Sequence, residues 1–220
     1  MSKKPDLTIK SAKKKILKNC NKPLKELVPE DTDFDEFNRN KGKTGQLLEL
    51  AIGKSLDNKP KDFKDGELKT YKAKEDKSAK ETIAITQISS NNIDDILKEN
   101  PFKKSSLYSK IENTLFVPTL KEGNPEDWEF LDAIQVNLKK ERNLRRELKK
   151  DYEKICKETK QNIENGDTLH TVSGKYLQIR SKDTKPYHKV YSEKYNRDVS
   201  NKNYAFYFKK DFIDEIKKES

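Results

Sequence analysis

The sequence contains few of the residues that form disulfides or bind metals through sulfur and imidazole. Its 220 residues include only two cysteines, Cys20 and Cys156, and two histidines, His170 and His188. Two cysteines cannot build a disulfide framework or a four-cysteine zinc site, and the shortage of histidine argues against a mixed Cys/His zinc site. We therefore expect both thiols to be reduced, structural groups.

Long apolar segments are also absent. No run approaches the roughly 18 apolar residues of a membrane-spanning helix, and the basic start at 1–5 lacks the apolar stretch of a signal peptide. Apolar residues make up only 31% of the chain and charged residues 39%, although nine Tyr and nine Phe can still supply a core. The sequence predicts a soluble, cytoplasmic protein with a thin core and no membrane partner.

Positive charge dominates the charged residues. The chain has 48 Lys and Arg against 38 Asp and Glu, a formal net charge of +10. Such a balance favours a polyanionic partner and says nothing about fold. Nucleic acid is the leading candidate. An anionic membrane surface is less favoured, because no predicted helix combines a large apolar face with aromatic anchors.

The apolar pattern predicts a mixed architecture. No internal repeat and no Gly/Ser-rich or Pro-rich linker is present, which favours a single domain over residues 1–220. Periodicity predicts helices over residues 7–27, 44–52, 93–97, 138–164 and 211–218. It predicts strands over residues 66–73, 82–88, 114–120, 128–138, 169–180 and 204–208, with a basic loop between the last two. The expected class is α/β (α+β), with a central mixed sheet of about five strands flanked by helices.

One short segment combines two acids and a lysine on a predicted strand. Glu67 and Lys69 are two residues apart, so in a strand they share a face at a separation of roughly 6–7 Å. Asp62 lies across a turn and can bring its carboxylate beside Glu67. Two carboxylates are hard oxygen ligands for Mg²⁺, and a neighbouring lysine can orient or deprotonate an attacking water. The segment is equipped for phosphodiester hydrolysis.

The same pattern has simpler interpretations. Acid and lysine at this spacing are common in a chain with 39% charged residues, and a solvated strand is the alternative. Glu49, on the helix upstream, is either a paired structural residue or a further carboxylate directed at the metal. Asp65 can replace Asp62 as the first carboxylate, but Asp-Gly is also an ordinary turn pair.

Four sequence blocks resemble a known family. They are KGKTGQLLE at 41–49, KPKDFKDGELKT at 59–70, GKYLQIRSK at 174–182 and FYFKKDF at 206–212. In order and approximate spacing they resemble the catalytic core of MutH and the Sau-type GATC restriction endonucleases, over roughly residues 40 to 215. The resemblance implies a restriction-endonuclease-like fold with a D…ExK active site.

The resemblance also implies roles for individual residues. Asp62, Glu67 and Lys69 fall on the family's metal-binding and catalytic triad, and Glu49 falls on its additional metal-binding carboxylate. The implied cofactor is Mg²⁺, which Mn²⁺ can replace. The gap between Asp62 and Glu67 is shorter than in MutH itself, and this keeps Asp65 open as a substitute ligand.

Other matched positions concern the substrate. Lys110 falls on a further lysine that the family uses near the scissile phosphate. Tyr207, in the last block, falls on the family's tyrosine near the target adenine. The predicted DNA-binding residues are Arg180, Lys182, Tyr207, Lys209 and Lys210. The single domain would then comprise a helical N-terminal part (1–40), a catalytic core (41–120) and a DNA-recognition part (165–215).

The composition of residues 175–210 supports DNA binding independently of the resemblance. This stretch has eight Lys and two Arg against three acids, a net charge of +7, and six of the nine tyrosines. Basic side chains neutralise phosphates and can donate to guanine O6 and N7. The alternative is a lysine-rich surface with tyrosines in the core. The basic helix at 138–164 is better interpreted as a solvated face with i,i+4 ion pairs.

Three functions follow as hypotheses. The first is a Mg²⁺-dependent, sequence-specific DNA endonuclease cutting at GATC as a type II restriction enzyme, with double-stranded DNA as partner and a homodimer on the palindrome. The second is a MutH-like mismatch-repair nickase that needs a MutL-type activator. The Lys- and Asn-rich composition suggests an AT-rich organism and favours restriction. The third is a non-catalytic, basic nucleic-acid-binding protein.

Overall fold

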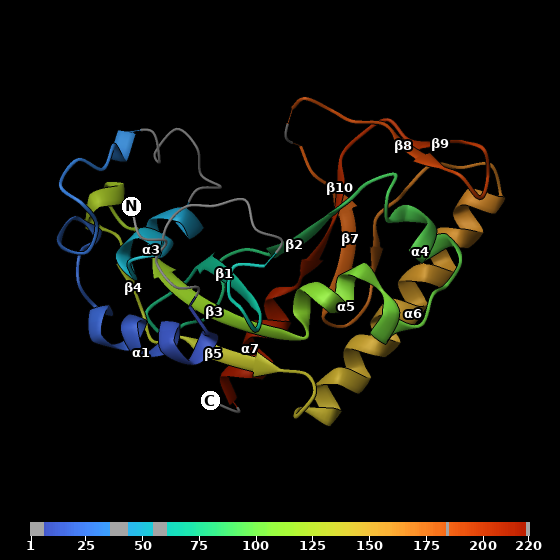
Figure 1. Cartoon of the computed structure of the whole chain (residues 1–220). Coiled ribbons are helices and arrows are strands. Elements are labelled where there is room, and N and C mark those ends of the chain that lie inside the picture. The colour runs from blue at the N-terminus through green and yellow to red at the C-terminus, as the bar shows by residue number, and fades with distance from the viewer. Residues whose placement is uncertain (1–6, 36–43, 55–60, 184, 219–220) are drawn as a thin grey trace. The chain divides into compact units, whose positions relative to one another are not determined.

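The computed structural model describes residues 7–35, 44–54, 61–183 and 185–218, and Figure 1 shows the arrangement of its elements. Its helices are α1 (Ile9–Asn19), α3 (Thr44–Ala51), α4 (Ile93–Leu97), α5 (Ser106–Ile111), α6 (Arg142–Glu164) and α7 (Lys210–Lys218). Short 3₁₀ turns in the described ranges lie at Leu24–Glu26, Phe102–Lys104 and Pro125–Asp127. The chain forms two compact units, one from residues 1–81, 113–137 and 216–220, the other from 82–112 and 138–215.

The strands divide between the two units. Those of the first unit are β1 (Glu67–Lys72), β3 (Asn113–Leu120), β4 (Glu129–Phe130) and β5 (Ile134–Asn137). Those of the second unit are β2 (Ile83–Ile88), β6 (Val172–Ser173), β7 (Leu177–Ser181), β8 (Val190–Ser192), β9 (Arg197–Ser200) and β10 (Tyr204–Phe208).

In the first unit, β1 runs parallel to β3, and β3 pairs antiparallel with β4 and β5. Glu67 lies opposite Thr114, and Leu68 lies opposite Leu115. Because side chains alternate between the two faces of a strand, Leu68 faces the main hydrophobic core of this unit. Glu67 and Lys69 therefore lie on the opposite face of β1.

Helices α1 and α3 cover the Leu68 face. Their buried side chains form one cluster with this strand and with β3: Ile9, Ala12, Ile16, Leu47, Leu48, Ala51, Leu115 and Val117. Thr8 caps α1 in a capping box with Ser11. From α1, Lys15 Nζ donates to the Ile52 carbonyl (2.6 Å), which follows the last turn of α3. The two helices are thus joined by polar contacts as well as by the core.

The second unit is built on the antiparallel sheet β2-β10-β7-β6. All five residues of β10 are buried, as expected for a strand paired on both sides. Helix α6 buries one face, including Leu144, Leu148, Tyr152 and Ile155. Strands β8 and β9 form a separate hairpin.

Much of the predicted pattern is confirmed. The mixed class is confirmed, as are α4, β3 and the buried face of α6. The long helix predicted over 7–27 instead ends at Asn19, and Asn21 adopts a left-handed φ of 59°. The chain leaves the helix because Cys20 is extended and the Asn21 N–H donates to the Phe130 carbonyl at 2.9 Å, not to a carbonyl of α1.

The sheet arrangement differs from the prediction. The described residues form two four-stranded sheets and a hairpin instead of one sheet of about five strands. The difference arises because β1 pairs with β3 while β2 pairs with β10, and apolar alternation does not specify pairing partners. The predicted 128–138 strand is two short strands, β4 and β5, although Leu131 between them still donates to the Pro118 carbonyl of β3 at 2.9 Å. The range 41–120, predicted as a catalytic core, draws on both units.

Candidate active site

Asp62 is held at the edge of β1, in the turn that leads into this strand. The Leu68 N–H donates to Asp62 Oδ2 at 2.8 Å, and the turn closes with a bond from Phe63 N to the Gly66 carbonyl at 2.9 Å. Leu68 lies between Glu67 and Lys69. The carboxylate of Asp62 is therefore fixed beside the two residues that the D…ExK resemblance pairs with it.

Glu67 is a buried acid on the face of β1 away from the main core. Glu67 is only 4% exposed, and Lys69 on the same face is half-buried. Thr114, opposite Glu67 on β3, has a buried hydroxyl with no hydrogen-bond partner in the described part of the chain. A buried polar oxygen without a partner is unusual. The face thus offers a carboxylate and an unsatisfied hydroxyl at neighbouring positions.

Asp65 serves a different purpose. Its Oδ1 accepts the Ile9 N–H at the start of α1 (2.8 Å), and its carbonyl accepts from Asn113 Nδ2 (2.6 Å). These bonds tie the turn to α1 and to the start of β3. Of the two acids considered from the sequence, Asp62 is the one held at β1.

Gly66 lets the turn approach β3 closely. A Cβ atom at this position would lie 2.1 Å from the Asn113 carbonyl oxygen and 2.6 Å from Ile9 Cδ1. Neither distance is compatible with van der Waals contact. Only glycine fits here without moving the turn that carries Asp62.

Glu49 is paired inside its own unit. Lys54 Nζ lies 2.8 Å from Glu49 Oε2, and the side chains are 10% and 12% exposed, respectively. Of the two interpretations of Glu49, the structure supports a paired residue. In the parts of the chain that the structure describes, no three His, Cys, Asp or Glu side chains are grouped closely enough to hold a metal ion.

Asp62 and Glu67 nevertheless suit a magnesium ion. Mg²⁺ is commonly bound through one or two carboxylates, with waters and substrate phosphates completing its shell. Asp62 at the edge of β1 and Glu67 on its face both offer carboxylate oxygens, and the unsatisfied Thr114 hydroxyl offers another oxygen. Glu49 lies on α3, which packs on the Leu68 face of β1, and its carboxylate is paired with Lys54. The residues present thus fit a two-carboxylate site.

Lys110 lies in the last turn of α5 and is half-buried. It belongs to the second unit, whereas Asp62, Glu67 and Lys69 belong to the first. Its action at the scissile phosphate stays a prediction.

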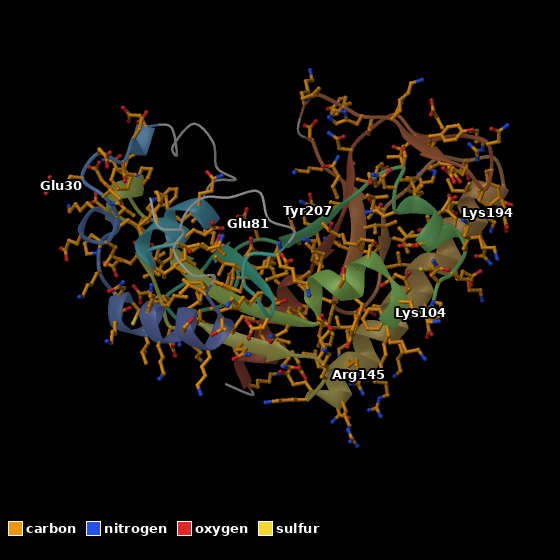
Figure 2. The ribbon with its side chains drawn as sticks, viewed as in Figure 1. Glu30, Glu81, Lys104, Arg145, Lys194 and Tyr207 are labelled. Atoms are coloured by element: carbon orange, nitrogen blue, oxygen red, sulfur yellow. The ribbon has the colours of Figure 1, made fainter. Side chains whose placement is uncertain are left out.

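Arg180 and Tyr207 come together on adjacent strands of the second unit. The Arg180 guanidinium carbon lies 4.6 Å from the centroid of the Tyr207 ring, a cation–π contact. Tyr207, labelled in Figure 2, is buried at a register shift between β10 and β2. Bulges of this kind often redirect a side chain near a functional site. The ring holds the exposed Arg180 in place.

The three predicted DNA-binding lysines lie in different surroundings. Lys209 Nζ donates to the Gly174 carbonyl at 3.1 Å. The backbone N–H of half-buried Lys182 donates to the Asn203 carbonyl at 2.7 Å, and Lys210 is exposed at the start of α7. Lys209 therefore has a structural contact, while the ammonium of Lys210 faces solvent.

Asp151 is a structural residue that the sequence interpretation missed. It is buried in α6, and its carboxylate accepts backbone N–H bonds from Lys175 (2.7 Å), Tyr176 (2.6 Å) and Leu177 (2.9 Å). A Cβ at Gly174 would lie 2.3 Å from Asp151 Cγ. This acid fixes the turn into β7, the strand that carries Arg180. Its position on the apolar side of α6 was the available signal.

Several basic residues of 175–210 are used within the fold. Arg197 donates to the Ile163 and Asp167 carbonyls (2.7 and 2.9 Å), and Lys194, labelled in Figure 2, donates to the Leu97 carbonyl (2.7 Å). Among the tyrosines of the stretch, 176, 204 and 207 are buried, whereas Tyr187 and Tyr191 are exposed. The alternative of tyrosines in the core thus holds for three of these residues, while others of the stretch stay exposed and available for a partner.

Helix α6 is the solvated, ion-paired helix that the sequence predicts. Lys149 and Lys154 pair with the acids four residues later, at 3.4 and 3.8 Å, and Lys150 pairs with Glu147 at 2.8 Å. The α6 thiol is inert at neutral pH, because burial raises the pKa of Cys156 to about 12. It is no candidate nucleophile.

No helix in the described part of the chain has both the length and the apolar character needed to cross a bilayer. The chain matches no known protein-family model, and no curated protein matches it.

Proposed function

We propose that this protein is a Mg²⁺-dependent, sequence-specific DNA endonuclease with a restriction-endonuclease-like fold, cutting at GATC as a type II restriction enzyme. The observation that carries the proposal is the Asp62 carboxylate bound to the Leu68 N–H, between Glu67 and Lys69. Two acids and a lysine at the start of one strand are the groups that metal-assisted phosphodiester hydrolysis requires.

In this proposal Asp62 and Glu67 hold the metal, with Glu49 as a further carboxylate if Lys54 releases it. Bound Mg²⁺ supplies a Lewis acid that makes water more acidic and offsets charge on the phosphoryl oxygens. The Lys69 ammonium holds the attacking water by a hydrogen bond and stabilises negative charge that grows at the phosphate.

DNA recognition is assigned to the second unit. Arg180 is exposed and oriented by the Tyr207 ring, so its guanidinium can donate two hydrogen bonds to one guanine edge. Lys210 is available for a phosphate contact. A homodimer on the palindromic site would supply a second catalytic segment for the other strand.

Cleavage of supercoiled plasmid with Mg²⁺ tests the proposal. The wild type should linearise plasmid that is unmethylated at GATC and leave methylated plasmid intact. Lys69→Ala should abolish cutting, while Lys72→Ala, on the same strand but the opposite face, should cut normally. Open-circular product alone would instead indicate the nickase and call for a MutL-type activator.

A second candidate is a non-catalytic, basic nucleic-acid-binding protein. The pairing of Glu49 with Lys54 favours it, as does the lack of a three-acid group among the described residues. This candidate predicts DNA binding that is unchanged by Lys69→Ala and no cutting of either plasmid with Mg²⁺ or Mn²⁺.

A further inference from the structure

Helix α1 carries a concentrated positive face that the catalytic proposal does not use. Between Leu7 and Lys25 the chain has seven lysines and no acid. Two of them have structural partners: Lys15 donates to the Ile52 carbonyl, and Lys25 pairs with Asp127. Four others form what we call the α1 lysine face: Lys10, Lys13, Lys14 and Lys18.

These four lysines have no ion-pair partner in the part of the chain that the structure describes, and all except the half-buried Lys13 are exposed. Lys10, Lys14 and Lys18 recur at i, i+4 and i+8, which places ammonium groups about 6 Å apart along the helix axis. Like charges at this spacing repel one another. A lysine in the first turn is also unfavourable to the helix dipole.

Helix α6 provides an internal comparison. It has five lysines in 23 residues, the same number that α1 has in 11. Three of them, Lys149, Lys150 and Lys154, each pair with an acid of α6 itself. The lysine-rich character of the whole protein therefore does not account for α1. A repulsive face with no acidic partner among the residues that the structure describes favours an external polyanion as the compensating partner.

The face lies apart from the candidate active site within the first unit. Ile9, Ala12 and Ile16 pack α1 into the core with Leu68, so the lysines project outward from that side of the sheet. Glu67 and Lys69 lie on the opposite face of β1. A polyanion on α1 would be a second contact and would not occupy the catalytic position.

The burial of the apolar face of α1 also indicates which kind of polyanion binds. A membrane-binding amphipathic helix inserts its apolar face into lipid, but the apolar face of α1 is occupied by the core and only Leu17 is exposed. We infer that the α1 lysine face binds the phosphate backbone of double-stranded DNA without regard to sequence, as a second DNA contact beyond that of the proposed endonuclease site.

The test compares two variants of equal charge. One replaces Lys10, Lys13, Lys14 and Lys18 with glutamine, and the control makes the same change at Lys149, Lys150, Lys154 and Lys157 of α6. Affinity for a GATC-free duplex is measured by fluorescence anisotropy in EDTA over a series of salt concentrations. The α1 variant should bind roughly tenfold more weakly, and its slope of log K against log salt should fall by about 0.9 for each phosphate that it no longer neutralises.

The α6 control should keep the wild-type slope, and a four-arginine version of the α1 face should restore binding. Circular dichroism and thermal unfolding establish that each variant is folded. Equal reductions in affinity in the α1 and α6 variants, or an unchanged slope in the α1 variant, would overturn the inference. So would intact DNA binding in an α1 variant that no longer binds phosphatidylserine vesicles, which would assign the face to membranes. Cutting of GATC plasmid is scored separately, so a failure of the endonuclease proposal is distinguishable.

Discussion

Asp62 and Asp65 lie in the same turn, but their carboxylates have different partners. Asp62 accepts the Leu68 N–H at the edge of β1, and Asp65 accepts the Ile9 N–H at the start of α1. Asp62→Asn keeps an acceptor for Leu68 and loses only the charge. We expect its cleavage rate to fall by roughly 100-fold or more with little change in melting temperature, as measured by plasmid cleavage and thermal unfolding.

Asp65→Asn is the matched control for that prediction. It keeps an acceptor for Ile9 and should cleave at a rate close to that of the wild type. If Asp65→Asn abolished cleavage while Asp62→Asn retained it, Asp65 and not Asp62 would be the metal-binding acid.

Gly66 is a site where one methyl group should disturb the same turn. The added Cβ would lie 2.1 Å from a backbone oxygen of β3, and a backbone atom cannot rotate away. We expect Gly66→Ala to lower the free energy of unfolding by at least about 2 kcal/mol, measured by urea denaturation. Gly45→Ala, where no atom lies within 4 Å of the added Cβ, is the control. Equal stability of the two variants would contradict this packing.

Cys156 should make stability depend on alkaline pH. Its pKa is raised to about 12 by burial, above its ordinary value of 9.0. Above pH 9 the unfolded state loses the thiol proton while the folded state keeps it. The free energy of unfolding therefore has its full value below pH 9 and falls as the pH rises further. Urea midpoints should fall between pH 9 and about pH 12, and fall less in Cys156→Ala. An identical decline in both proteins would argue against a buried thiol.

At the scale of elements, Asp151 connects α6 to the turn that begins β7. Asp151→Ala would leave three buried or half-buried N–H groups without their acceptor. We expect the free energy of unfolding to fall by about 2–4 kcal/mol, measured by urea denaturation. Glu153→Ala, at an exposed position of the same helix, should change stability little. A similar small effect in Asp151→Ala would show that the turn is held by other contacts.

The predictability of the elements follows from how local their causes are. Helix α6 and strand β3 were predicted from apolar periodicity because their own residues carry the pattern. The hairpin β8–β9 was missed, since its buried apolar positions are few and its anchors lie elsewhere, such as Asp94, which accepts from Ser192 Oγ. Strand partners were not predicted, because pairing depends on residues distant in the chain.

For the candidate site too, local features were predictable from the sequence and long-range contacts were not. The spacing of Glu67 and Lys69 placed them on one strand face from sequence alone. The choice between Asp62 and Asp65 required long-range contacts, since only α1 and β3 show what Asp65 holds. The pairing of Glu49 with Lys54 was one of two open interpretations, and only the folded chain distinguishes them.

At the scale of the whole molecule, the net charge of +10 is used in several ways. Lysines of α6 pair with acids, whereas Arg197 and Lys194 donate hydrogen bonds to backbone carbonyls. The α1 lysine face has no acidic partner among the described residues. The proposed division of labour assigns catalysis to the first unit and sequence recognition to the second. Arg180→Ala should accordingly reduce discrimination for GATC more than Lys210→Ala, measured as cleavage of GATC relative to altered sites.

The most direct measurement is Mg²⁺-dependent cleavage of a duplex with one GATC site, with the product ends mapped on both strands. The wild type should cut at GATC and leave a duplex with that site scrambled intact, and Lys69→Ala should bind the same duplex without cutting it. Lys72→Ala should behave as the wild type. A wild-type protein that binds but does not cut with Mg²⁺ or Mn²⁺, or a Lys69→Ala protein that cuts at the wild-type rate, would contradict the assignment of this site as an endonuclease centre.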